Sequence, residues 1–333
     1  EEVRLIAKAS IKKIKDNRSS ANYSFVQLNA QGACPFQQAD KLCLIQSRMG
    51  EKALSKTCST YPRKQGVLDQ GQVEGATLSC PEAARLCLLA PDAMQIEGRS
   101  HTLSFDANTP MLNDNQTPLD FLHSSAMGLL EDDRILPEEF ILIYSSALSL
   151  FLKNSDNAFS KESRFIEFST LIRHVQRSLA SVRTSALNDD PAIRFQIGKV
   201  MPLLIKRSRE ILIQNKRFGA AVIRCLEGLA VEKGDIAVSE KRYTEAMKSL
   251  TKHEKDTLTL GFRNYLMNDL IINSVRYRSS GDAAFSALQG SAVRLCIFMF
   301  LVLGAKAADD AVNIAEVLVE AVSSSARAFE HNS

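Results

Sequence analysis

Apolar residues recur every three or four positions through the second half of the chain, the spacing of a buried stripe on a helix. One such stripe runs through Phe165, Phe168, Leu171, Val175, Leu179, Val182 and Ala186. Another helix is predicted to begin at Pro137, where proline suits the first helical position and the two following acids suit the positive end of the helix dipole. Further helices are predicted over residues 191–216, 218–231, 239–255, 257–277, 283–304 and 309–329. This half therefore predicts a bundle of roughly seven or eight helices.

The first part of the chain has a different pattern. A short helical spacing at the N-terminus, from Val3 to Ala9, gives way to short apolar runs and turns over residues 31–118. We therefore expect a mainly α protein with a small, cysteine-rich lobe of loops and short helices over residues 1–118 and a larger helical bundle over residues 119–333. The length of 333 residues agrees, because a usual domain has ~100–200.

Charge and hydropathy exclude two classes of partner. Lys and Arg number 41 against 38 Asp and Glu, and the basic residues are dispersed, so we expect no nucleic acid. The most apolar run, residues 295–305, is eleven residues long, whereas a membrane-spanning helix needs ~20, so we expect a buried core helix and no membrane. The chain opens at Glu1 without Met or a secretory signal pattern. We expect its natural start to lie upstream and its location to be cytoplasmic.

Five of the seven cysteines gather between residues 34 and 87, and this clustering needs a cause. Disulfides, buried thiols, and a metal or iron–sulfur site are the three explanations. A large helical chain with an odd number of cysteines does not resemble a disulfide scaffold. Cys225 and Cys296 lie among apolar residues at helical spacing, so we assign those two to the core.

The spacing of the clustered cysteines leaves buried thiols and a metal site open, because it lacks the paired C-x2-C steps of a zinc ribbon. Cys34 and Cys80 are each followed by proline, as in the ending of some iron–sulfur motifs. Thiolate ligands also select zinc or iron–sulfur clusters over hard cations. Cys87 lies among leucines on a predicted helix, and we expect it to be a core thiol rather than a ligand.

These cysteines lie within a long series of short motifs that follow one another in a fixed order. The pattern consists of Cys34-Pro35-Phe36, Leu42-Cys43-Leu44-Ile45-Gln46, Gly50-Glu51, Leu54-Ser55, Thr57-Cys58, Tyr61-Pro62-Arg63 and Leu78-Ser79-Cys80-Pro81-Glu82-Ala83-Ala84-Arg85. This segment resembles the flagellin lysine-N-methylase family. The resemblance covers residues 34–87, about a sixth of the chain. In the helical half, only a weak similarity to the family is found, at Asn264-Tyr265-Leu266.

The resemblance implies a bacterial cytoplasmic enzyme that transfers methyl groups from S-adenosylmethionine to ε-amino groups of surface lysines on flagellin. It also implies an iron–sulfur cluster of the 4Fe-4S type, with Cys34, Cys43, Cys58 and Cys80 as the matching ligands. Four cysteine ligands would close such a cluster, whereas three would leave an iron open for chemistry, and both arrangements stay open. Members of the family usually begin with a further cysteine-rich segment.

Tyr61 and Arg63 follow the third of these cysteines and are expected to line the cluster or donor pocket. Arg63 would bind the donor's carboxylate through a bidentate pair, or alternatively cap a helix carbonyl. Ser79 and Glu82 have the spacing of a capping box, so we expect Glu82 to cap a helix rather than to catalyse. The chain has no G-x-G-x-x-G loop, so the donor site is expected to differ from that of a doubly wound sheet. No catalytic residue is assigned.

Two further classes of protein compete with the enzyme. In one, a cysteine-bound metal braces a non-catalytic helical scaffold that binds a partner protein, and such a scaffold has no reason to bind S-adenosylmethionine. The other is a cysteine-dependent hydrolase, which needs a histidine beside its nucleophile. The five histidines show no recognisable pairing with a cysteine motif and are expected to be structural or exposed: His101, His123, His174, His253 and His331.

Overall fold

The computed structural model confirms a mainly α protein. It describes residues 1–13, 24–29, 33–40, 42–68, 71–95, 120–154, 161–182, 215–231 and 235–330. The contacts divide the chain into two compact units, residues 1–61 and residues 62–333. The boundary that the sequence predicted at residue 118 lies outside the described residues.

The first unit consists of short elements. These are α1 (Glu2–Ser10), β1 (Ile11–Lys13), β2 (Ser24–Val26), α2 (Leu44–Met49), η1 (Glu51–Ala53) and α3 (Lys56–Thr60). The predicted N-terminal helix is confirmed as α1, and β1 and β2 pair in an antiparallel arrangement. Phe36 and Leu44 are the most buried of the described residues in this unit, at 3% and 4% exposed, and they anchor its cysteine-bearing turn.

The second unit contains a β-hairpin and the larger helices. Its elements are β3 (Arg63–Leu68), β4 (Gly71–Ala76), α4 (Pro81–Leu89), α5 (Asp120–Glu131), α6 (Pro137–Asn154), α7 (Lys161–Val182), α10 (Lys216–Gly228), α11 (Ile236–Ser249), α12 (Lys252–Ile272), α13 (Ser274–Ser279), α14 (Gly281–Ala308) and α15 (Ile314–Glu330). The antiparallel hairpin of β3 and β4 was not predicted from the sequence. The helix predicted over residues 191–216 falls almost wholly outside the described residues.

The boundary between α11 and α12 differs from the prediction, which put it near residue 256. A capping box sets the boundary earlier, because Thr251 Oγ1 accepts a hydrogen bond from the Glu254 amide (3.2 Å) and Glu254 Oε2 accepts one from the Thr251 amide (2.7 Å). These reciprocal bonds satisfy amides that the first turn of a helix leaves unpaired. The prediction was wrong because it followed apolar spacing alone, which continues across the break.

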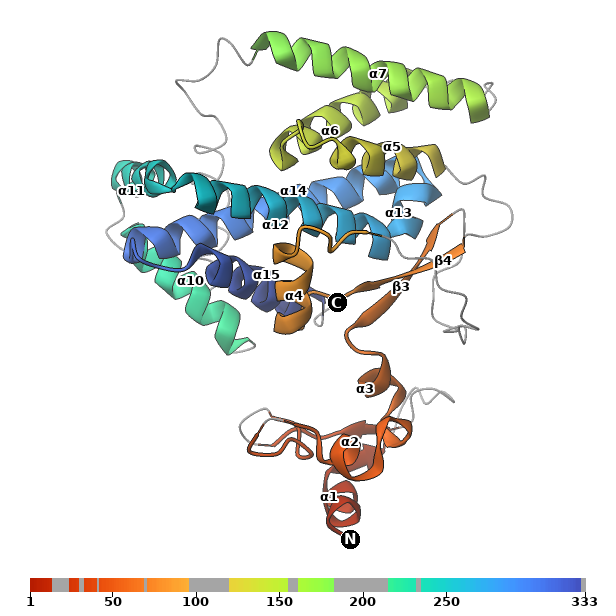
Figure 1. The fold of residues 1–333 in the computed structure, drawn as a ribbon, viewed down its shortest axis with the longest axis vertical. Helices are drawn as coiled ribbons and strands as arrows, with labels where there is room; N and C mark the ends of the chain where they lie inside the picture. Colours follow the sequence, from red (N-terminus) through yellow and green to blue (C-terminus); the bar gives the residue numbers. More distant parts are fainter. Residues whose placement is uncertain are drawn as a thin grey trace. The chain divides into compact units, whose positions relative to one another are not determined.

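α14 forms the centre of the second unit, where it packs against α6, α10, α11, α13 and α15 (Figure 1). Among the described residues it is the one helix long and apolar enough to cross a membrane by length and composition. Half of its most apolar stretch is buried inside the protein, and a core helix meets the same criteria. Phe298 and Phe300 are among its buried side chains, at 1% and 0% exposed.

The hairpin and α4 both pack against α12 in the second unit (Figure 1). Two glycines make this close approach possible. A Cβ atom on Gly66 would overlap the carbonyl oxygen of Ile271, and one on Gly75 would come within 2.6 Å of the Ile272 side chain. The segment between residues 62 and 89, which carries the end of the motif, is thus held directly on α12.

Candidate functional site

Two of the predicted ligand cysteines lie on neighbouring segments of the first unit. Cys34 begins a tight turn, in which the Gln37 amide donates to the Cys34 carbonyl (2.9 Å). Gln37 in turn forms an antiparallel bridge with Cys43, which is the residue before the first turn of α2. The Cys34 side chain is exposed and the Cys43 side chain is half-buried.

The other two predicted ligands belong to different units. Cys58 is exposed on α3 in the first unit, where its amide donates to Ser55 Oγ (3.2 Å). Cys80 is half-buried in the second unit and precedes the first turn of α4, with Pro81 at the first helical position. Within the described part of the chain, no group of three His, Cys, Asp or Glu side chains is close enough to hold a metal ion. The four-cysteine ligand set therefore stays a prediction.

The chemistry of these thiols fits an iron–sulfur cluster. All four are free and at least partly accessible. Cys43 and Cys80 also share one backbone conformation, with φ of −85° and −83° and ψ of 120° and 119°, and the side chain of neither caps its helix. Thiols in this state are available as thiolate ligands.

The remaining cysteines have the environments expected of core thiols. Cys87 is 7% exposed, and burial raises its pKa to about 12. Cys225 is fully buried, donates to the Phe300 carbonyl (3.2 Å), and has a pKa raised well above its usual value by the same burial. Cys296 is half-buried and packs against the core. The assignment of these three to the core is confirmed.

The histidines within the described residues show no pairing with a cysteine. His123 is buried, with Nε2 3.2 Å from the Leu270 carbonyl, while His174 and His253 are exposed. His101 and His331 lie outside the described residues. The described histidines thus have the structural or exposed positions that the sequence predicted.

The structure corrects the predicted capping role of Glu82. Because Pro81 takes the first helical position of α4, Cys80 and not Ser79 precedes the helix. Ser79 Oγ instead lies 3.1 Å from Thr77 Oγ1, and Glu82 makes a two-pronged ion pair with Arg85, with bonds of 2.7 and 2.9 Å. This pair is the main cause of a lowered Glu82 pKa.

Tyr61 and Arg63 flank the junction between the two units. Tyr61 ends α3 and is 41% exposed. Arg63 opens β3, is exposed, and has its Nε 3.6 Å from Glu74 Oε1 on β4. The next residue, Lys64, faces the other side of the strand, because successive side chains alternate. That side faces a cavity.

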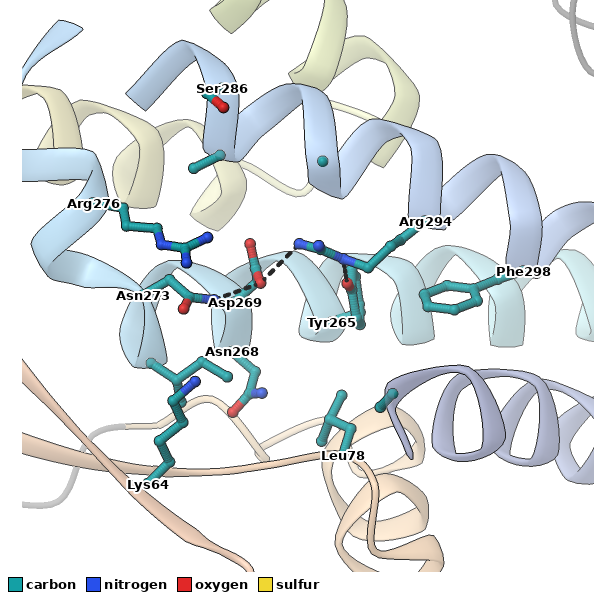
Figure 2. A pocket seen from close by; sticks show the side chains of 14 residues that line it. Lys64, Leu78, Tyr265, Asn268, Asp269, Asn273, Arg276, Ser286, Arg294 and Phe298 are labelled. Atoms are coloured by element: carbon teal, nitrogen blue, oxygen red, sulfur yellow. Dashed lines mark hydrogen bonds and ion pairs between the residues drawn. The ribbon is translucent and has the colours of Figure 1, made fainter. Parts of the chain in front are cut away.

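This cavity, of about 320 Å³, lies in the second unit against β3, α12, α13 and α14 (Figure 2). Its polar wall consists of Lys64, Asn268, Asp269, Asn273, Arg276 and Arg294. Leu78 and Phe298 contribute apolar surface, and Leu78 comes from the motif segment that ends in α4. The volume is at the lower end of the ~300–1,000 Å³ of small-molecule pockets.

A buried carboxylate organises the floor of this cavity. Asp269 is 6% exposed and accepts hydrogen bonds from Ser291 Oγ (2.7 Å), Asn273 Nδ2 (2.9 Å) and Arg294 (3.2 Å). Arg294 Nε also donates to the Tyr265 hydroxyl, as the dashed lines of Figure 2 show. Burial lowers the Arg294 pKa, but Tyr265 and Asp269 raise it by more, so the guanidinium is firmly charged. The network fixes these side chains in place.

Polar side chains of α12 also hydrogen-bond to β4 and α4, which carry the end of the motif, beside the cavity. Asn264 Nδ2 donates to the Cys87 carbonyl (2.9 Å) and the Ala90 carbonyl (3.0 Å), at the end of α4 where carbonyls lack helical partners. One turn later, Asn268 Nδ2 donates to the Ala76 carbonyl of β4 (3.0 Å). In the weakly similar segment 264–266, Asn264 therefore contacts α4 and Tyr265 lines the cavity.

Sequence reasoning missed this cavity, although a signal for it was present. Asn264, Asn268, Asp269 and Asn273 recur at helical spacing within an otherwise apolar segment. Buried polar side chains require partners, so such a stripe indicates a second polar surface packed on the helix. The helix was predicted from its apolar spacing alone, so the polar positions were not interpreted.

Comparison with known proteins supports the resemblance over part of the chain. A segment of 99 residues is 35% identical to the lysine-N-methylase of Salmonella typhimurium, and the same figures hold for the lysine-N-methylase of Salmonella choleraesuis. A segment of 95 residues is 37% identical to the "Flagellar biosynthetic protein FliU" of Salmonella muenchen. No family model and no solved structure matches the chain.

These matches are partial in both directions. They cover 29% of this chain and 24% of each lysine-N-methylase, and 28% of this chain and 55% of the FliU protein. The chain thus spans about a quarter of the length of the two lysine-N-methylases. The resemblance to the lysine-N-methylases, which the sequence motifs predicted, is confirmed over that segment.

Proposed function

We propose that the protein is a lysine N-methyltransferase that transfers methyl groups from S-adenosylmethionine to surface lysines of flagellin. The observation that carries the proposal is the 35% identity to two lysine-N-methylases over 99 residues. The flagellar name of a third relative supports flagellin as the substrate. The proposal places the protein in the bacterial cytoplasm, where it would act on flagellin monomers.

The proposed reaction is a displacement at carbon. The substrate amine forms a bond to the methyl carbon of the donor, the bond from that carbon to sulfur breaks, and its electron pair stays on sulfur. Lysine has an ordinary pKa near 10.4, so the protein must remove a proton from its ammonium group before attack. Burial of the amine and a nearby acceptor would both favour this loss.

Cys34, Cys43, Cys58 and Cys80 would hold the 4Fe-4S cluster. Held by all four cysteines, such a cluster would be closed and would brace the fold; held by three of them, it would offer an open iron position for the donor. The donor set is appropriate, since all four thiols are free and at least partly accessible. Tyr61 and Arg63 remain predicted residues of the cluster or donor pocket.

The proposal is tested on protein purified without oxygen. Iron and acid-labile sulfide are measured, and the protein is incubated with methyl-labelled S-adenosylmethionine and flagellin monomers. Cys34→Ala and Cys80→Ala are expected to lose the cluster and the label on flagellin together. The matched control is Cys296→Ala, which removes a half-buried core thiol outside the motif and should keep both.

The alternative scaffold predicts a different result. A metal-loaded protein that neither binds S-adenosylmethionine nor labels flagellin would contradict the methyltransferase and favour a non-catalytic, metal-braced module for a partner protein. Loss of iron in the cysteine variants, with flagellin still fully labelled, would reject only the dependence of methylation on the cluster.

A further inference from the structure

Two cations of the cavity have no partner within the described part of the chain. The side chains of Lys64 on β3 and Arg276 on α13 make no hydrogen bond or ion pair with a described residue. Figure 2 shows both side chains pointing toward Asn273 from opposite sides. Asp269 is the one acid among the described lining residues, and Arg294, Ser291 and Asn273 already bind it.

The lining therefore favours an anionic group in the cavity. Lys64, Arg276 and Arg294 carry three positive charges against the single charge of Asp269. A protein lysine is disfavoured there, because its ammonium group would meet the same charge. Lysine and arginine side chains that face one space bind carboxylates or phosphates through charge-assisted hydrogen bonds.

Asn273 adds an acceptor beside these donors. Its Nδ2 atom donates to Asp269, while its Oδ1 atom accepts no hydrogen bond from a described residue. An acceptor between two cationic donors complements a zwitterion, with the ammonium on Asn273 Oδ1 and the carboxylate on Lys64 and Arg276. A phosphate would leave that oxygen without a partner.

We propose that this cavity binds the α-amino-acid end of the methyl donor, with Lys64 and Arg276 as its carboxylate-binding residues. The inference rests on the proposed function. The cavity volume of about 320 Å³ suits the amino-acid end rather than the whole donor. The sulfonium methyl group would then face outward, toward a protein substrate. This assignment uses Lys64 where sequence reasoning selected the adjacent Arg63.

The test is a calorimetric titration with two ligands. S-adenosylhomocysteine carries the amino-acid end, and 5′-methylthioadenosine lacks it. Lys64→Ala and Arg276→Ala are each expected to weaken binding of S-adenosylhomocysteine about tenfold or more and to leave 5′-methylthioadenosine unchanged. Both residues are exposed, so the variants should fold, which their thermal unfolding verifies.

Lys241→Ala is the matched control, since it removes an exposed cation on α11 that lies outside the cavity and pairs with Glu245. It should bind S-adenosylhomocysteine as the unmodified protein does. Loss of binding in Arg63→Ala with normal binding in Lys64→Ala and Arg276→Ala would overturn the inference. Competition provides a second check: methionine should displace S-adenosylhomocysteine, and inorganic phosphate at the same concentration should not. Equal displacement by phosphate would overturn the amino-acid assignment.

The two levels of the proposal fail differently. If the unmodified protein binds S-adenosylmethionine and labels flagellin while Lys64→Ala and Arg276→Ala keep full affinity, only the location of the donor site is wrong. If the unmodified protein binds neither S-adenosylmethionine nor S-adenosylhomocysteine, the methyltransferase itself is wrong.

Discussion

Burial separates the cysteines by reactivity as well as by environment. Cys34 and Cys58 are exposed, whereas Cys87 and Cys225 are buried. The thiolate is the reactive form of cysteine, and with its pKa raised to about 12 by burial, Cys87 is ionised in only about one molecule in 10,000 at pH 8. Low exposure and a raised pKa therefore both make Cys87 less reactive.

We predict that iodoacetamide at pH 8 alkylates Cys34 and Cys58 in the metal-free native protein long before Cys87 or Cys225. Peptide mass spectrometry of timed samples measures the four rates. In guanidinium chloride the buried environments are lost, and all four thiols should react at similar rates. Alkylation of native Cys87 as fast as Cys34 would contradict its assignment to the core.

At the scale of elements, two glycines show opposite requirements. Gly66 lies where β3 meets α12, and a Cβ atom there would overlap the Ile271 carbonyl. Gly128 is exposed within α5, and a Cβ atom there would contact nothing within 4 Å. A methyl group thus crowds the first site and lowers the entropy cost of folding at the second.

We predict that Gly66→Ala lowers the free energy of unfolding by about 1–3 kcal/mol through overpacking. Gly128→Ala should raise it by about 0.5–1 kcal/mol, because alanine favours the helix interior. Urea unfolding monitored by circular dichroism measures both. A stabilising Gly66→Ala would mean that the hairpin does not pack on α12.

The capping box of α12 makes stability depend on pH. The hydrogen bond from the Thr251 amide is the main cause of a Glu254 pKa below its ordinary value of 4.5, and Lys306 lowers it further despite the opposing effect of burial. A carboxylate with a lowered folded pKa stabilises the fold above its unfolded pKa, and this stabilisation is lost as pH falls through the folded value.

We predict that Glu254→Gln costs about 1 kcal/mol of unfolding free energy at pH 7. The difference from the unmodified protein should shrink as the pH falls from 4.5 through the lowered folded pKa of Glu254, below which both side chains are uncharged. Urea unfolding across this pH range measures the difference. Glu245→Gln, a change in an exposed i,i+4 pair on α11, is the control and should show a much smaller effect. A difference for Glu254→Gln that is independent of pH would refute the role of its charge.

At the scale of the whole molecule, the two units differ in how they are stabilised. Among the described residues, the continuous hydrophobic core lies wholly within residues 62–333. In the described part of the first unit, the buried apolar residues are Phe36 and Leu44. Three of the four predicted cluster ligands also lie in the first unit.

We predict that a chain shortened to residues 62–333 keeps cooperative thermal unfolding and most of its helicity, because its core is retained. The same chain should bind no cluster, since it lacks Cys34, Cys43 and Cys58. Circular dichroism and iron analysis measure these two properties. Non-cooperative unfolding of the shortened chain would show that residues 1–61 are needed for the fold.

Much of the fold could be predicted from periodicity, and less of the site. Within the described residues, most helices from Pro137 onward follow from apolar spacing, because a stripe on a helix reports its buried face directly. The start of α12 did not follow, because its capping box sets that boundary. The β3–β4 hairpin did not follow, since its glycine-rich strands show no clear alternation. The glycines of the hairpin are explained by its position in the fold, because Gly66 and Gly75 lie in close contact with α12.

The sequence by itself determined the mainly α class, the core thiols at Cys87 and Cys225, and the partial resemblance to lysine-N-methylases, because each depends on local spacing or on residue identity. Only the tertiary structure decided which polar residues share a cavity. Lys64, Asp269 and Arg294 come from three elements that lie up to 230 positions apart, and a sequence pattern carries no record of such distant pairings. The structure also gave Lys64 rather than Arg63 the side of β3 that faces this cavity, since the packing of a strand selects one of its two faces.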